Sequence, residues 1–144
     1  MTPVERIISK GQLVPLIFSQ DAAAASQSAV ALKILEVASA ANNGVDEVIM
    51  PWDFDIVGVS LSSDSAVTTG SALVDPTING TATGLQAQVD TTNTLRHRKT
   101  QPRYQDRGTA GQYVGCKLTT SSDFAPVTAD VVAVVWVLAY VDTL

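Results

Sequence analysis

The chain has very little of the chemistry on which most enzymes and metal sites depend. Its 144 residues include one cysteine, Cys116, and one histidine, His97. These counts exclude an internal disulfide, and they exclude a zinc site made of four cysteines or of two cysteines and two histidines. His97 stands between Arg96 and Arg98, and two neighbouring cations disfavour the imidazolium that Ser-His-Asp catalysis needs. The glycines at 108, 111 and 115 form neither a phosphate-binding loop nor a dinucleotide-binding fingerprint. We therefore expect no enzyme activity, no cofactor and no metal ion.

Charged residues, aromatic residues and long apolar runs are also scarce. Only 16% of the residues are charged and 6% are aromatic, whereas 46% are apolar. The longest apolar run covers residues 131–141, and 11 residues are too few to span a bilayer as a helix. Its valines predict a central strand buried on both faces. Glu5, Arg6 and Lys10 interrupt the region where a secretory signal would be apolar, so neither export nor a membrane partner is expected.

Short strand-like segments follow one another along most of the chain. The segments "DEVIMP", "FDIVGVSLS", "SALVDPTING" and "GQYVGCKLTT" are separated by turn residues. Alternation places Val57, Val59 and Leu61 on one face, and Asn79-Gly80 is a strong hairpin signal. Cys116 is predicted to be a small buried strand residue. Seven or eight strands at about ten-residue spacing predict an all-β, antiparallel sandwich or barrel.

The first 44 residues allow more than one interpretation. Pro3, Gly11 and Pro15 break up the apolar groups of residues 1–20, which predicts an extended N-terminal arm followed by a single domain over 21–144. This arm could dock on its own domain or on a neighbour. Residues 21–44 are alanine-rich and end in Asn43-Gly44, which suits a helix. The alternation of Val30, Leu32 and Ile34 instead predicts a strand at about 28–37.

Positive charge gathers in one place. The stretch "TLRHRKTQPRYQDRG" (94–108) holds five of the nine Lys and Arg residues and one acid, Asp106, so its net charge is +4. The whole chain is −5, so the remainder sums to −9. A solvated loop or guarded edge strand, a protein contact and a nucleic-acid site are the three possibilities. The sequence pI of about 4.6 argues against nucleic acid, and an acidic protein surface is the better functional partner.

Three weaker signals have ordinary explanations. "DFD" (53–55) places two carboxylates on one face of a strand, a conceivable cation site that is more often only solvated. Asn79-Gly80-Thr81 matches a glycosylation sequon, but the hairpin explains it. Trp52 beside Asp53 could serve a sugar-binding surface, although a Trp after a Pro at a strand end more often packs at the rim.

Beyond these features, the run 56–94 resembles a recurrent sequence in small structural proteins of tailed bacteriophages, the capsid decoration (cement) and head-fibre-like proteins. The segments that carry the resemblance are "MPWDFDIVGVS" (50–60), "PTINGTATGL" (76–85) and "FAPVTADVVAVVWV" (124–137), within roughly the last 95 residues. The resemblance implies a β-sandwich or jelly roll, commonly a homotrimer, on the outer surface of a virion. It also implies that the N-terminal segment contacts the shell.

These observations predict a non-enzymatic capsid decoration protein that binds the major capsid protein of a phage head and stabilises it. The alternative is a virion fibre module that binds a receptor or carbohydrate, and a nucleic-acid-binding protein ranks third. The predicted partner-contact residues come from the arm and from the basic stretch. They are Ile7, Ile8, Leu13, Ile17, Phe18, Arg96, Arg98, Lys99, Arg103 and Arg107.

Overall fold

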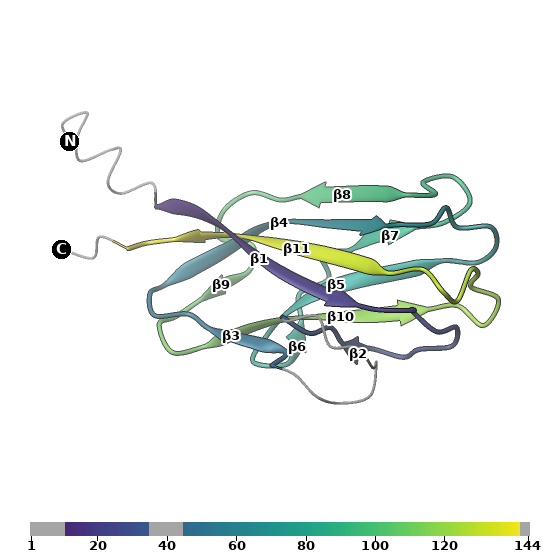
Figure 1. Cartoon of the computed structure of the whole chain (residues 1–144). Helices are drawn as coiled ribbons and strands as arrows, with labels where there is room; N and C mark the ends of the chain where they lie inside the picture. The colour runs from purple at the N-terminus through teal and green to yellow at the C-terminus, as the bar shows by residue number, and fades with distance from the viewer. Residues whose placement is uncertain (1–10, 35–44, 142–144) are drawn as a thin grey trace.

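The computed structural model of the chain describes residues 11–34 and 45–141, and these form two antiparallel β-sheets packed face to face (Figure 1). Sheet A has the order β1-β11-β4-β8, with β9 pairing the other end of β4. Its strands are β1 (Gln12–Gln20), β4 (Phe54–Ser63), β8 (Arg96–Thr100), β9 (Arg107–Gly108) and β11 (Val131–Ala139). Within the described ranges there is no helix, so the predicted all-β class is confirmed.

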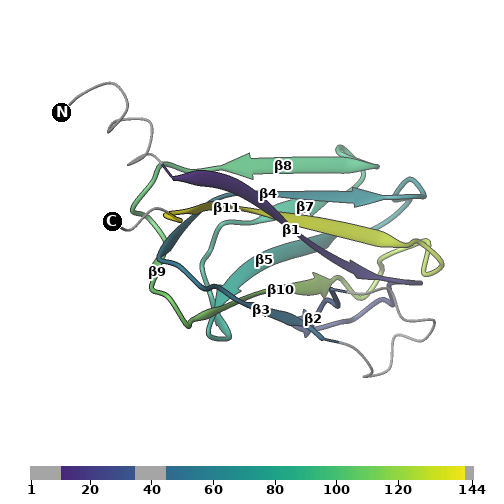
Figure 2. The same ribbon diagram turned by 60° about the vertical axis from the view of Figure 1, so that its left-hand side comes forward.

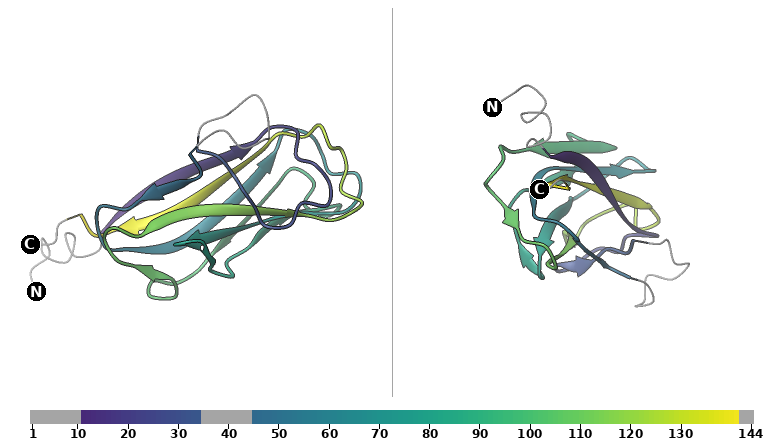
Figure 3. Two further views of the ribbon diagram at one scale, coloured as in Figure 1. Left: turned by 90° about the horizontal axis from the view of Figure 1, so that it is seen from below. Right: turned by 90° about the vertical axis from the view of Figure 1, so that its left-hand side faces the viewer.

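Sheet B has the order β2-β10-β5-β6, with β3 on β10 and β7 on β5. Its strands are β2 (Val30–Ala31), β3 (Glu47–Ile49), β5 (Ala72–Ile78), β6 (Thr81–Ala82), β7 (Ala87–Val89) and β10 (Tyr113–Thr120). The chain crosses repeatedly from one sheet to the other, and its final strands, β10 and β11, lie inside sheets begun by earlier strands. This is the path of a jelly roll, as predicted. Figure 3 shows the two layers from the end and the strands running along the molecule.

The space between the sheets is filled by apolar side chains from both layers. Along strands such as β11, alternate residues point into this space, because side chains alternate across a strand. The largest buried members are Phe18, Leu32, Phe54, Ile56, Leu61, Leu118 and Phe124. Cys116 is also buried on β10, as predicted. The Asn79-Gly80 hairpin is confirmed, since both residues have positive φ (50° and 80°) and join β5 to β6.

The predicted boundary at residue 20 does not coincide with the start of the sandwich. Residues 12–20 form β1, which pairs with β11 along its whole length, from Gln12 opposite Ala139 to Gln20 opposite Val131. Pro15 is tolerated because β1 is an edge strand of sheet A. The N-terminal ten residues, with Ile7 and Ile8, lie outside the described residues. The part of the arm that is described is therefore a strand of the domain.

Residues 21–34 contain no helix, and the predicted strand is reduced to Val30–Ala31. Hydrogen bonds to the 120–130 loop hold this segment instead, with Ala23 N donating to Ala129 O and Ser26 N to Ser121 O. Because these bonds satisfy the backbone, the alanines have no need of helical partners. Residues 35–44 lie outside the described part of the chain.

A β-bulge changes which side chains of β4 face the core. Trp136 pairs with Gly58 and Val137 pairs with Ile56, so Val57 is an extra residue in β4. Ile56 is therefore buried, and Val57 is only half-buried. The prediction that Val57 shares a face with Val59 and Leu61 was wrong, because a single inserted residue shifts the alternation.

The last strand, β11, is central, as predicted, but it is not buried on both faces. It lies between β1 and β4. Its burial alternates strictly between buried and partly exposed positions, and Val132 and Trp136 are exposed. One face of β11 packs in the core, and the other forms part of the molecular surface.

A candidate protein-binding face on sheet A

The outer face of sheet A carries a continuous row of large apolar side chains. Leu13 lies opposite Leu138, and Ile17 lies opposite Val134. Residues directly opposite in an antiparallel pair share a face. Leu13 is 57% exposed and Ile17 is 54% exposed. The apolar stripe, as we call this row, comprises Leu13, Ile17, Val57, Val132, Val134, Trp136 and Leu138. Contiguous apolar surface of this kind marks interaction sites on soluble proteins.

The stripe is hollowed beside the indole of Trp136. The hollow, of about 270 Å³, is lined by Leu13, Val57, Gly58, Thr100 and Trp136. Gly58 pairs with Trp136, and a Cβ added at Gly58 would lie 3.5 Å from the Trp136 Cβ. Because Gly58 has no side chain, the flank of the tryptophan stays open. This open flank leaves a depression in the apolar face into which a partner side chain can fit.

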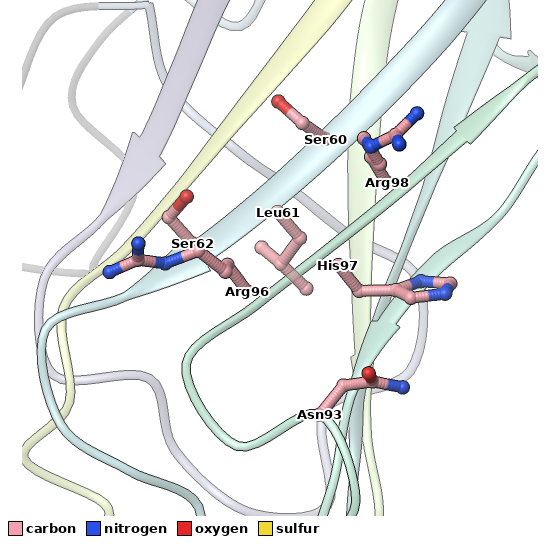
Figure 4. A pocket seen from close by; sticks show the side chains of 7 residues that line it. All are labelled: Ser60, Leu61, Ser62, Asn93, Arg96, His97 and Arg98. Carbon is pink, nitrogen blue, oxygen red and sulfur yellow. The ribbon is translucent and has the colours of Figure 1, made fainter.

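Beyond β4, the same face becomes basic at β8, which lies along the upper margin of the molecule in Figure 2 and pairs with β4 alone. Arg98 lies opposite Ser60, and Arg96 lies opposite Ser62. Figure 4 shows the two arginines on the same side as the two serines, while His97 points the other way. These four residues form what we call the Ser–Arg margin. A second hollow, of about 380 Å³, is lined by these four residues together with Leu61, Asn93 and His97, so it includes residues from both sides of β8.

Lys99 and His97 belong to the opposite side of β8. They alternate with Arg96 and Arg98 and pair with Val59 and Leu61, both of which are buried. His97 accepts a hydrogen bond at Nδ1 from the backbone N of Gln88, with a distance of 3.1 Å. This bond joins β8 to β7 across the edge of the sandwich, so the histidine has a structural partner.

Arg103 and Arg107 are engaged around a buried carboxylate at the end of the same face, where Asp55 lies opposite Leu138 and Arg107 lies opposite Asp55. Asp55 is fully buried and accepts hydrogen bonds from Arg107 Nε (3.1 Å), Arg107 Nη2 (3.3 Å) and Tyr140 Oη. Arg103 donates to the same Tyr140 oxygen from Nη2 (2.9 Å) and Nε (3.2 Å). Arg107 also lies over the ring of Tyr104, with Cζ 4.4 Å from the centroid.

The electrostatics of this cluster follow from its contacts. The hydrogen bonds from Arg107 to Asp55 raise the pKa of the guanidinium, and the hydrogen bond to Tyr140 raises the pKa of Arg103. Burial raises the pKa of Tyr140, and its bond to Asp55 acts in the same direction. The cluster therefore fastens the 101–107 segment to β4 and to the end of β11. Of the five cations in the basic stretch, two are held by hydrogen bonds within the chain.

The remaining candidate groups do not assemble a reactive site. Asp53 is exposed and accepts a hydrogen bond from Ala110 N (2.9 Å), so the "DFD" carboxylates serve two separate structural contacts. Trp52 is exposed beside it, but this carboxylate is already engaged.

Burial raises the pKa of the Cys116 thiol, which keeps it protonated. In the described ranges, no group of three His, Cys, Asp or Glu side chains could hold a metal ion, and no helix is long and apolar enough to cross a membrane.

The predicted contact residues are thus dispersed to different environments. Leu13 and Ile17 lie in the apolar stripe, and Arg96 and Arg98 lie in the Ser–Arg margin. Phe18 is fully buried and belongs to the core, because it alternates with Ile17 along β1. Lys99 is exposed on the other side of β8. A contact role stays a prediction for the four residues on the outer face, for Lys99, Arg103 and Arg107, and for Ile7 and Ile8, which lie outside the described residues.

The stripe residues of β4 and β11 were missed by sequence reasoning. The signal lay in residues 131–139, where the side chains expected on each of the two faces of the strand are all Ala, Val, Leu or Trp. Such a run suits a strand buried on both sides, and it equally suits a strand whose outer side is covered only by a partner.

Comparison with known proteins supports the fold. The sequence matches no protein-family model and no curated protein. The chain is similar to a protein of the acid-stable capsid of Helicobacter pylori bacteriophage KHP30, with 11% identity, a TM-score of 0.50, and coverage of 89% of this chain and 88% of that chain. It is also similar to a protein of the cyanophage Pam1 capsid asymmetric unit (16% identity, TM-score 0.46, covering 90% and 86%). A carbohydrate-binding module, CBM36 in complex with calcium and xylotriose, matches with 17% identity and a TM-score of 0.35, covering 88% and 97%. The first of these similarities shows a shared jelly-roll fold, and the other two are too weak to carry an argument.

Proposed function

We propose that the protein is a non-enzymatic structural component of a phage virion, a decoration (cement) protein that binds the major capsid protein on the outside of the head. The observation that carries this proposal is the exposed apolar stripe with its basic margin on one face of sheet A. A decoration protein needs a stable body and a contact surface, and it needs no active site. The resemblance of residues 50–137 to decoration proteins and the shared fold of a phage capsid protein support the same role.

The environments of the reactive side chains support a non-enzymatic role. His97 is hydrogen-bonded to β7, Cys116 is buried and protonated, and Asp55 is paired with Arg107. Each of these three groups thus has a structural contact or is buried away from solvent. Reaction chemistry needs such groups to face a substrate in a shared cavity.

Binding to phage heads that lack the protein tests the proposal. Ile17→Glu places a charge in the apolar stripe and should abolish co-sedimentation with the heads, because a desolvated charge without a partner opposes binding. Val127→Glu is the matched control, since Val127 is 51% exposed and lies in the loop before β11, outside both sheets. Both variants should keep the circular-dichroism spectrum of the wild type. If Ile17→Glu binds heads as the wild type does, sheet A is not the attachment surface.

We also propose that the protein is a homotrimer. The apolar content of 46% is high for a chain with so few charges. Exposed apolar residues lie on sheet B as well, at Val30, Ile49 and Tyr113, so one attachment face does not account for all of them. Light scattering at micromolar concentration should give a mass of about 45 kDa, three times the 15.1 kDa of the chain. A mass of one chain would contradict the trimer.

A further inference from the structure

The Ser–Arg margin has the geometry of a binding site for carboxylates. We infer that Ser60 with Arg98, and Ser62 with Arg96, receive acidic side chains of the partner protein while the apolar stripe packs against its apolar surface. This inference rests on the proposed function, because it specifies the chemistry of the surface that the protein attaches to.

Cross-strand pairing builds two equivalent rungs. In each rung, a serine of β4 lies directly opposite an arginine of β8 on the outer face. A hydroxyl and a planar guanidinium together offer several donors to one carboxylate. Residues two apart on a strand are separated by about 6.6 Å, so the rungs match Asp or Glu side chains at alternate positions of an extended partner segment.

Arg96 and Arg98 are available for this role. Among the described residues, the ion pairs are Lys33 with Asp46 and Arg107 with Asp55, and neither includes these two arginines. Both are exposed. The hydrogen bonds from Ser63 N to Leu95 O and from Gln101 N to Val57 O show that odd-numbered β8 positions bond to β4. The backbone groups of Arg96 and Arg98 therefore point away from β4, toward the open edge.

A partner protein with acidic groups fits this face better than a second copy or a nucleic acid. If two copies met through this face, the described strands of sheet A would offer the margin no free carboxylate. The described strands of sheet A place one acid, Asp55, at an outward register position, and Arg107 already occupies it. A nucleic acid would need cations along a track, but the surface next to the margin is apolar, at Val57 and Trp136. The negative charge of the whole chain would also repel phosphates.

The competing explanation is that the charges of β8 only guard an open edge against pairing with other strands. The two explanations differ at Lys99. An edge guard depends on charge anywhere along β8, so Lys99 would count as much as Arg98. A carboxylate site depends on which face of β8 carries the charge, and Lys99 lies on the opposite face from Ser60 and Ser62. The adjacent residues Arg98 and Lys99 are therefore a matched pair that differ in direction.

The experiment compares Arg98→Gln and Arg96→Gln with Lys99→Gln, each of which removes one charge from the same strand. The first probe is an extended seven-residue peptide with Asp at alternate positions, titrated into isotope-labelled protein and followed by amide chemical shifts. A peptide with Asn in place of Asp is its control. Shifts should map to the Ser–Arg margin, and each Arg variant should weaken binding at least tenfold, whereas Lys99→Gln should change it less than twofold. Binding should also weaken as salt is added.

The second probe is co-sedimentation with phage heads, in which the Arg variants should bind more weakly than Lys99→Gln. Equal losses for all three variants would overturn the inference in favour of edge protection. Salt-sensitive binding of single-stranded DNA by the wild type, lost in the Arg variants, would overturn the inference in favour of nucleic acid. A light-scattering mass of the Arg variants that differs from that of the wild type would overturn it in favour of a second copy.

Failure of the inference can be told from failure of the proposed function. If the heads bind all variants and the wild type equally, the attachment function stands and the carboxylate site is wrong. If the heads bind none of the proteins, the attachment function is wrong. The peptide titration then tests the carboxylate site independently of the heads: binding that the Arg variants lose supports the site, and no binding contradicts it.

Discussion

Replacing Asp55 by Asn tests whether the buried carboxylate holds the 101–107 segment in place. Asp55 is fully buried and accepts three hydrogen bonds, two from Arg107 and one from Tyr140. Asn keeps the shape of the side chain but removes its charge and turns one acceptor into a donor. The amide oxygen can still accept one hydrogen bond from Arg107, but the amide nitrogen cannot accept the other.

The expected loss can be estimated from these contacts. Hydrogen bonds to charged groups contribute about 1.5–3 kcal/mol, whereas neutral bonds contribute about 1 kcal/mol. Breaking a fully buried ion pair costs about 3–5 kcal/mol, but the Arg107 side chain is 47% exposed and can be hydrated once its partner is gone. We therefore expect Asp55→Asn to lower the free energy of unfolding by about 2 kcal/mol. For a chain of this size, that lowers Tm by roughly 4–8 °C.

Urea and thermal unfolding followed by circular dichroism measure the effect. Asp53→Asn is the matched control, because it makes the same chemical change two residues away. Asp53 is exposed and accepts one backbone hydrogen bond, which the Asn oxygen can keep. It should stay within about 0.5 kcal/mol of the wild type. Equal effects at the two positions would refute the reasoning, and a more stable Asp55→Asn variant would show that desolvation of the carboxylate outweighs its bonds.

Burial and strand pairing lead to three further predictions. Because burial raises the pKa of Tyr140, its contribution to stability is complete below the pKa of an unfolded tyrosine, about 10, and is lost as pH rises through the native pKa. In an ultraviolet titration of the native protein, Tyr140→Phe should therefore remove a phase that ionises above the usual tyrosine range. Cys116 should resist alkylation in the native protein and react only on unfolding, because its thiol is buried and its pKa is raised. Deleting residues 2–18 should unfold the domain, since it removes most of β1 and the buried Phe18.

Each of these outcomes has a clear opposite. Loss of an earlier phase of the titration in Tyr140→Phe would show that the residue is not shielded. Rapid alkylation without denaturant would place the thiol at the surface. A truncated protein with native circular dichroism would mean that β1 is dispensable and acts as an attachment arm.

Local chemistry was enough to predict much of this protein. The spacing of strands and turns indicated an antiparallel all-β domain, because alternation of apolar residues and turn residues such as Asn79-Gly80 act over a few neighbours. The same reasoning placed Cys116 in a buried strand and the 96–107 stretch partly on an edge. The jelly-roll path came from the resemblance to phage proteins, because strand order depends on pairing between distant segments.

The tertiary structure decided which face each strand presents and which charges are free. Val57 turns outward because β4 gains one residue opposite β11, and a one-residue shift reverses every later side chain. Arg107 and Arg98 look alike in sequence, but Arg107 bonds to Asp55, 52 residues earlier, and Arg98 lies opposite Ser60 at the surface. Contacts between residues so far apart leave no local pattern. The sequence by itself therefore determined that strands form and where they turn, whereas the packing of the two sheets determined the apolar stripe, the Ser–Arg margin and the buried carboxylate.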